Sequence, residues 1–60
     1  MKVLKATEVA KKTSLSVPHI WRMAREDKFP KPFKLSDHRS GWLEDDVDAW
    51  ISERIGATNA

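Results

Sequence analysis

The chain has 60 residues, which is room for one domain, and a domain this small buries only roughly 60% of its unfolded surface, so we expect a small core. It has no cysteine, which excludes disulfides, cysteine-ligated zinc and thiol catalysis, and this is typical of a protein in a reducing cytosol. No apolar run approaches the roughly 20 residues that span a bilayer, so we expect a cytoplasmic protein with no membrane partner.

The net charge of +2 conceals an uneven distribution. Ten basic and four acidic residues give residues 1–40 a net charge of +6, whereas one basic and five acidic residues give residues 41–60 a net charge of −4. A basic part of this kind suits a polyanion such as DNA. A lopsided surface is also common in small soluble proteins, so charge by itself leaves both interpretations open.

The first helix is predicted to begin near Thr7, because threonine is a good N-cap and Glu8 then lies at the positive end of the helix dipole. It is expected to end at Thr13-Ser14, where two hydroxyl side chains compete for backbone hydrogen bonds. Leu15 then lies alone between two serines, which predicts that its side chain packs into the core.

The second helix is predicted to begin at Ser16, a strong N-cap, with Pro18 in the first turn, where a missing N–H costs nothing. It must end before Phe29-Pro30, since a proline disfavours the α conformation in the residue before it. Helical spacing places one group of residues on the buried face, namely Ile20, Met23, Ala24 and Asp27. The opposite side comprises Pro18, Arg22, Arg25 and Phe29.

A hairpin is predicted to follow. The prolines at positions 30 and 32 forbid a helix, and Phe33 and Leu35 alternate with Lys34, as in a short edge strand. Residues 36–41 are rich in turn formers, and Trp42-Leu43 is the expected returning strand.

The last helix opens with the acidic residues 44–46, which its dipole favours. An amphipathic stripe follows, formed by Val47, Trp50, Ile51, Arg54 and Ile55. Gly56 is the expected stop. The domain is therefore predicted to span residues 1–55, with residues 56–60 as a flexible C-terminal tail.

The order helix, tight turn, helix, hairpin, helix predicts a mainly α fold with a small β-hairpin, a winged helix-turn-helix in which the hairpin is the wing. The predicted core contains Leu4, Val9, Leu15, Ile20, Phe33, Leu35, Trp42, Val47, Trp50, Ile51 and Ile55.

These segments resemble the AlpA/excisionase-like group of winged-helix proteins within the MerR-type superfamily. The resemblance covers roughly residues 3–55, and it is carried by residues 7–10, 15–16, 20–22, 29–32, 41–42 and 47–51 in that order and spacing. The group commonly has a glycine at three places where this chain has none. These are the turn, which has Ser14, the loop before Phe29, which has Asp27-Lys28, and the wing tip, which has Ser36-Asp37. Aspartate adopts the left-handed conformation at modest cost, so Asp27 and Asp37 fit the fold.

The resemblance implies a phage or mobile-element protein that binds specific double-stranded DNA and catalyses no reaction. It implies a transcriptional regulator, an excisionase (recombination directionality factor), or both, with a tyrosine recombinase (integrase) or RNA polymerase as protein partner. It also implies several copies on neighbouring DNA sites, and a nucleoid-associated location when the protein is bound.

In a helix-turn-helix the second helix enters the major groove with its first residues near the bases. We therefore expect Arg22 to contact a base and Arg25 a phosphate. Pro18 and His19, next to Val17 at the helix start, are candidates for a thymine methyl or a phosphate, and equally for capping or surface roles. Trp21 is expected to pack against the wing, which is compatible with a phosphate bond from its indole N–H.

The wing supplies further candidates, of which Arg39 is the strongest, because a cationic side chain at a wing tip suits a narrow minor groove. The others are Lys31, Lys34, His38 and Ser40. Ser14 and Ser16 could bond a phosphate, although a plain N-cap is the stronger interpretation of Ser16. The remaining basic residues are expected to contribute only to the general field, namely Lys5, Lys11, Lys12 and Lys28.

Other function classes find less support in the residues. The acidic residues 44–46 and Asp48 could hold a metal or face a neighbouring copy, but capping of the last helix explains them without a metal. The aromatic residues suit a core better than a base-stacking platform. No Gly-rich phosphate loop or nucleophile motif is present, so we expect no enzyme, metal or cofactor. The alternative is a protein-interaction adaptor that uses the same fold without binding DNA.

Overall fold

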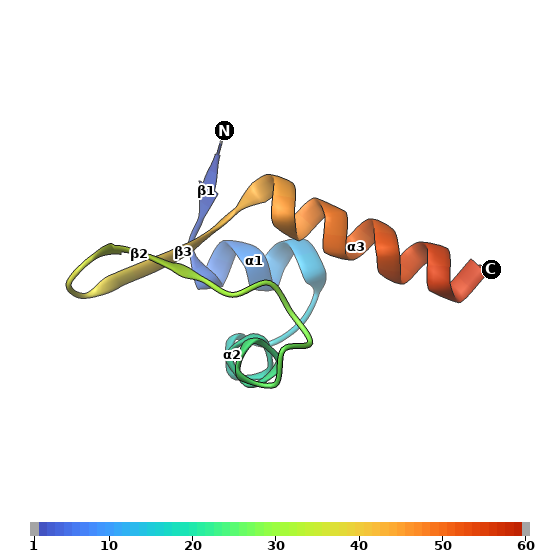
Figure 1. Ribbon diagram of the computed structural model, residues 1–60, viewed down its shortest axis with the longest axis horizontal. Helices are drawn as coiled ribbons and strands as arrows, with labels where there is room; N and C mark the ends of the chain where they lie inside the picture. Colours follow the sequence, from blue (N-terminus) through green and yellow to red (C-terminus); the bar gives the residue numbers. More distant parts are fainter. Residues whose placement is uncertain (1, 60) are drawn as a thin grey trace.

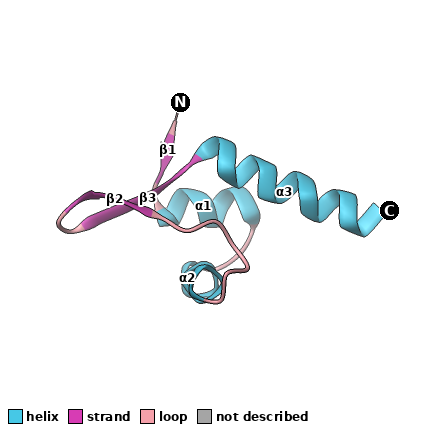
Figure 2. Ribbon diagram, viewed as in Figure 1, coloured by secondary structure: helices cyan, strands magenta, loops and turns pink. Residues whose placement is uncertain are grey.

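The computed structural model describes residues 2–59 of the chain, with side chains as far as Gly56. Its elements in chain order are β1 (Val3–Leu4), α1 (Ala6–Thr13), α2 (Val17–Arg25), β2 (Phe33–Ser36), β3 (Arg39–Leu43) and α3 (Glu44–Asn59). Figures 1 and 2 show the β2–β3 hairpin on one side of α1, α2 seen end-on below it, and α3 extending away on the other side. The predicted class, a mainly α protein with a small hairpin, is confirmed, and the architecture is compatible with a winged helix-turn-helix.

The start of α1 differs from the prediction. The N-cap is Lys5, and Thr7 lies inside the first turn. The Glu8 carboxylate accepts a hydrogen bond of 2.9 Å from the Lys5 backbone N–H. The Glu8 carboxylate therefore satisfies a backbone N–H at the start of the helix, whereas the sequence pattern predicts that the Thr7 hydroxyl caps it.

The end of α1 agrees with the prediction. The Thr13 hydroxyl donates to the carbonyl of Val9 at 2.8 Å, and the next residue, Ser14, has φ 64° as the C-cap. This is the left-handed conformation that glycine adopts most easily at helix ends, so a serine here carries a conformational cost.

Both ends of α2 are capped by local hydrogen bonds. Ser16 is the N-cap, as predicted, and its hydroxyl accepts from the His19 N–H at 3.3 Å. After the helix the Lys28 N–H bonds the Met23 carbonyl at 2.8 Å, and the Asp27 N–H bonds the Ala24 carbonyl at 3.4 Å. This is the Schellman pattern, with Asp27 at φ 60° in the usual glycine position. Asp27 is therefore outside the helix and does not share its buried face.

The sheet has the strand order β1-β3-β2, all antiparallel, and β1 was not predicted. Leu4 pairs with Trp42 on the core side, so Gly41 and its partner Phe33 face the other way. Leu35 is the extra residue of a bulge, because Lys34 and Ser36 pair with consecutive residues of β3. Phe33 and Leu35 are consequently 39% and 49% exposed, and their predicted place in the core is wrong.

The core includes one aromatic residue that helical spacing misplaced. Phe29 is only 4% exposed, although the sequence put it on the outer side of the second helix. Because α2 ends before it, the chain turns Phe29 inward against Trp42, at 6.3 Å between ring centroids, and Trp50, at 4.8 Å. The buried cluster is Leu4, Val9, Ile20, Met23, Phe29, Trp42 and Val47, with Leu15, Trp50 and Ile51 partly buried against it.

The segment between α2 and the wing is held by two tryptophans. The Trp42 indole N–H donates to the Pro30 carbonyl at 2.6 Å, and the Trp50 indole N–H donates to the Lys28 carbonyl at 2.9 Å. Both carbonyls belong to irregular backbone, outside the regular hydrogen bonding of a helix or a sheet. These bonds therefore tie β3 and α3 to one short segment and fix where the wing lies relative to α2.

Helix α3 does not stop at Gly56 but continues to Asn59. Its first turns pack on the core through Val47, whereas Ile55 is 55% exposed, so the predicted burial of Ile55 is wrong. Figure 1 shows the reason, since the last turns extend beyond the other elements. The limit of the domain at residue 55 and the flexible tail remain predictions, and Ala60 lies outside the described residues. None of the helices within residues 2–59 is long and apolar enough to cross a membrane.

Replacing Ser14 by glycine should stabilise the fold, because a non-glycine residue in the left-handed region costs about 1 kcal/mol. We expect Ser14→Gly to raise the melting temperature by roughly 4–8 °C in a thermal circular dichroism scan. Ser52→Gly, in the exposed middle of α3, is the control and should lower it. Equal losses in both variants would show that residue 14 is not confined to this conformation.

Candidate nucleic-acid interface

Helix α2 separates its apolar and basic residues as the sequence predicts. Ile20, Met23 and Ala24 are buried, while Arg22 and Arg25 are exposed. Toward the start of the helix, Pro18 is exposed, and Val17 and His19 are half-buried. Ser16 precedes them as the N-cap. The helix thus presents two guanidinium groups and its first turn to solvent, which is the surface that a groove-binding helix needs.

Trp21 connects this helix to the sheet. Its ring lies 5.1 Å from the ring of Trp42 in β3, between centroids and at an interplanar angle of 57°, and the side chain remains 37% exposed. The predicted packing of Trp21 against the wing strand is confirmed. Its indole N–H donates to none of the described residues, so the phosphate bond remains a prediction.

The wing carries its polar side chains outward. Lys34 in β2, His38 in the turn and Arg39 at the start of β3 are exposed, and Ser40 is half-buried opposite Lys34. A bulge sharpens the twist of an edge strand. The hairpin extends away from the helices in Figure 1, with the bulge at Leu35 in its edge strand.

The ion pairs distinguish two groups of basic side chains. Lys31 bonds Asp27 at 2.9 Å and Lys28 approaches Glu26 at 3.8 Å. In contrast, no carboxylate within residues 2–56 pairs with the cations of α2 and the wing, namely Arg22, Arg25, Lys34 and Arg39. Lys31, which the sequence places in the same DNA-binding set, therefore differs from the rest, although its pair is highly exposed and thus weak.

Lys12 forms ion pairs within the protein, at its surface. Its ammonium group lies 2.9 Å from Asp48 and 3.4 Å from Glu44, so it joins α1 to α3. The hydrogen bond to Asp48 is the main cause that raises the pKa of Lys12 above its ordinary value of 10.5. The expectation that Lys12 contributes only to a general field is wrong, and the pair also neutralises part of the acidic patch.

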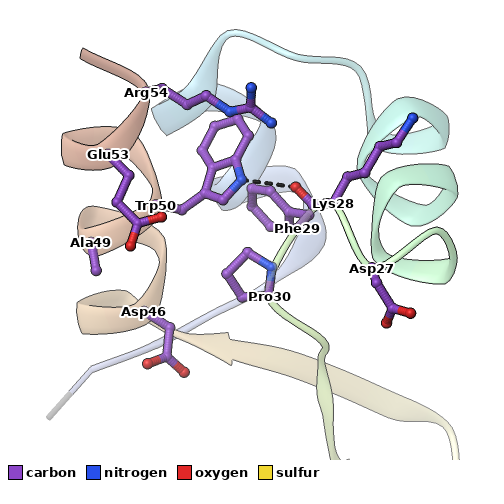
Figure 3. A pocket seen from close by; sticks show the side chains of 9 residues that line it. All are labelled: Asp27, Lys28, Phe29, Pro30, Asp46, Ala49, Trp50, Glu53 and Arg54. Atoms are coloured by element: carbon purple, nitrogen blue, oxygen red, sulfur yellow. Dashed lines mark hydrogen bonds between the residues drawn. The ribbon is translucent and has the colours of Figure 1, made fainter. Parts of the chain in front are cut away.

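An open cleft of about 740 Å³ separates α3 from the segment that follows α2. Figure 3 shows Trp50 and Phe29 at its centre, with Arg54 beside the indole ring, which its guanidinium carbon approaches to 4.9 Å from the centroid. Its charged lining comprises two cationic residues, Lys28 and Arg54, and three carboxylates, those of Asp27, Asp46 and Glu53. This cleft is a poor place for a phosphate, and the described residues contain no group of three or more acidic or histidine side chains arranged to hold a metal.

A smaller cavity was not anticipated from the sequence. Lys5 and Thr7 line it from the start of α1, and Arg39 lines it from the wing. From the sequence, Lys5 is expected only to add to the general electrostatic field of the protein, and Thr7 is expected to cap the first helix. Their place beside the wing depends on the pairing of β1 with β3, and a strand of two residues gives no periodic signal.

The comparison with known families gives one result. The sequence profile described as "Prophage CP4-57 regulatory protein (AlpA)" matches residues 2–55, which is nearly the whole chain. The chain belongs to the AlpA family. No curated protein and no solved structure matches it significantly.

Membership of the AlpA family agrees with the resemblance found in the sequence and supports a phage-type regulatory protein that binds DNA. AlpA proteins are regulators rather than enzymes. The matched residues include all of α2 and the wing and end within α3.

The Lys12 pair should depend on salt and pH. Lys12→Gln should lower the melting temperature at low salt, and the difference from the wild type should shrink as salt screens the pair. The pKa of Lys12 is higher in the folded protein than in the unfolded chain, so the pair stabilises fully below pH 10.5 and its effect disappears as the pH rises through the folded pKa. Lys11→Gln, one residue away, is the control and should be insensitive to both. A salt-independent loss in Lys12→Gln would indicate lost packing instead.

Proposed function

We propose that this chain is a sequence-specific, double-stranded DNA-binding regulator of a phage or mobile element. It acts by occupying its site, and the consequence is control of transcription, control of excision by a recombinase, or both. The proposal places the protein in the cytoplasm and on the nucleoid when bound.

The observation that carries the proposal is the set of unpaired cations on two adjacent elements. Arg22 and Arg25 on α2 and Lys34 and Arg39 on the wing have no carboxylate partner within residues 2–56, while other lysines do. Exposed cations that the fold leaves uncompensated on one pair of elements favour a polyanionic ligand. The contact between Trp21 and Trp42 holds these two elements together.

The two elements have different tasks in this mechanism. Helix α2 enters the major groove, where Arg22 donates to a guanine edge and Arg25 to a phosphate. Arg39 on the wing enters the adjacent minor groove or grips its backbone, and its contact senses groove width more than base identity. His19 and Pro18 lie at the start of α2 and contribute there.

Binding by several copies accompanies this mechanism. One module buries only roughly 600–1,000 Å² on DNA, which is usually too little for strong specificity. The exposed Asp45 and Asp46 at the start of α3 offer an acidic surface for the basic part of a neighbouring copy, or for a basic surface of an integrase or RNA polymerase. Footprinting on the natural site should show protection longer than one module covers, and protection of a single short site would contradict this part.

DNA binding itself can be tested without knowing the operator. We expect fluorescence anisotropy with a labelled random duplex to show affinity that falls steeply with salt, by about 0.9 in log–log slope for each neutralised phosphate. Arg25→Ala plus Arg39→Ala, which removes the two expected backbone contacts, should flatten that slope by up to about 2. Arg54→Ala removes the same kind of charge from α3 and serves as the control, with an unchanged slope.

The result decides between the two hypotheses for the fold. No binding of the wild type even at low salt would remove the DNA function and favour the protein-interaction adaptor. A slope that falls equally in the Arg54 variant would show that net charge, and not α2 and the wing, determines binding. Selection of binding sequences from a random pool then tests specificity, which Arg22→Ala should relax.

A further inference from the structure

The smaller cavity lies between the start of α1 and the wing and has a volume of about 300 Å³. It brings together two segments that are far apart in the sequence. Residues 5–7 form one wall, and the wing forms the other through Leu35, His38, Arg39 and Ser40. No carboxylate lines it.

The charges around this cavity are unbalanced. Lys5 and Arg39 both line it, and neither pairs with a carboxylate within residues 2–56. The nearest acid in sequence, Glu8, accepts a hydrogen bond from the Lys5 backbone and is not part of the lining. Thr7 and Ser40 add hydroxyl donors. The lining combines two cationic and two hydroxyl-bearing residues with the apolar Ala6 and Leu35 and includes no carboxylate. Its polar residues are of the kinds that bind an anionic oxygen group such as phosphate.

The backbone enforces this arrangement. Lys5 directly follows Leu4, which is buried and paired with Trp42 of β3. At Gly41 the strands approach so closely that a Cβ would lie 2.8 Å from Val3 Cγ1 and 3.1 Å from the Leu4 carbonyl oxygen. The start of α1 is therefore fixed against the wing strand, and Lys5 and Arg39 line the same cavity between them.

We propose that this cavity binds one phosphate of the DNA backbone that borders the groove contacted by the wing, with Lys5 and Arg39 as its cationic donors and Thr7 and Ser40 as neutral donors. The inference rests on the DNA binding proposed above and extends the interface to α1. A wing in a minor groove lies between two phosphate backbones, and the proposal places one of these backbones at the cavity. Because the contact is to phosphate, it strengthens binding to every sequence equally.

Lys5→Gln tests the proposal in the full chain. With a labelled random duplex, losing one phosphate contact should reduce the log–log salt slope by about 0.9, which is about an eightfold weaker affinity at 0.1 M salt. Lys5→Arg should keep the slope. Lys11→Gln removes an exposed lysine that does not line the cavity and should weaken binding by less than about twofold, the small effect of a screened distant charge.

Two further measurements distinguish one phosphate held by both Lys5 and Arg39 from a general effect of positive charge on DNA affinity. If Lys5 and Arg39 hold the same phosphate, the double variant Lys5→Gln/Arg39→Gln should lose less affinity than the product of the two single losses. The fold loss in Lys5→Gln should also be the same on duplexes of different sequence. Thermal scans of each variant show whether it folds like the wild type.

The outcomes distinguish this inference from the proposed function. If the wild type binds and Arg22→Ala weakens it, but Lys5→Gln behaves like Lys11→Gln, the phosphate site is wrong and the DNA function stands. Multiplicative losses for Lys5 and Arg39 would overturn the shared phosphate. If the wild type binds no DNA at all, the proposed function fails and the phosphate site fails with it.

Discussion

The structure depends on the place of Trp42 more than on any other side chain. Its ring is buried, contacts Trp21 of α2 and Phe29 of the following segment, and its strand position pairs with Leu4 of β1. Its indole N–H also satisfies the carbonyl of Pro30. A large aromatic ring contributes much of the buried area of a domain this small, and a buried N–H without a partner would be costly. One residue therefore supplies core packing and also fixes α2, the wing and β1 relative to one another.

This rigid connection determines what the charges can do. The basic groups of α2 and the wing would otherwise be free to find carboxylates elsewhere on the small surface. Instead, the acidic start of α3 is held against α1, where Lys12 pairs with Glu44 and Asp48. The acidic start of α3 is thus paired with Lys12, whereas the cations of α2 and the wing pair with no carboxylate within residues 2–56. The electrostatic asymmetry seen in the sequence becomes a difference between surfaces, which is the form that matters for a polyanionic partner.

Local signals in the sequence predicted the features that local chemistry controls. Ser16 as a cap, the buried face through Ile20, and the hairpin between residues 33 and 43 follow from side-chain hydrogen bonding, helical period and turn residues. The wrong predictions concern residues whose burial is determined by contacts with segments distant in the sequence. Phe29 is buried because two tryptophans from β3 and α3 surround it, and Leu35 is exposed because a bulge changes the strand register. Neither fact is contained in the neighbouring residues.

The candidate interface divides in the same way. Helical period alone places Arg22 and Arg25 on the exposed face, and the turn composition places Arg39 in the wing. The place of Lys5 beside the wing depends on β1, and the pairing of Lys31 with Asp27 lies in irregular backbone after α2, so neither was accessible to pattern analysis. Like charges gathered on one surface destabilise the free protein through repulsion, and a ligand that binds only the folded state stabilises it by mass action. In the proposed complex the unpaired cations, which cost stability in the free protein, would favour the folded state when DNA is bound. This would couple the stability of a small domain to occupancy of its site.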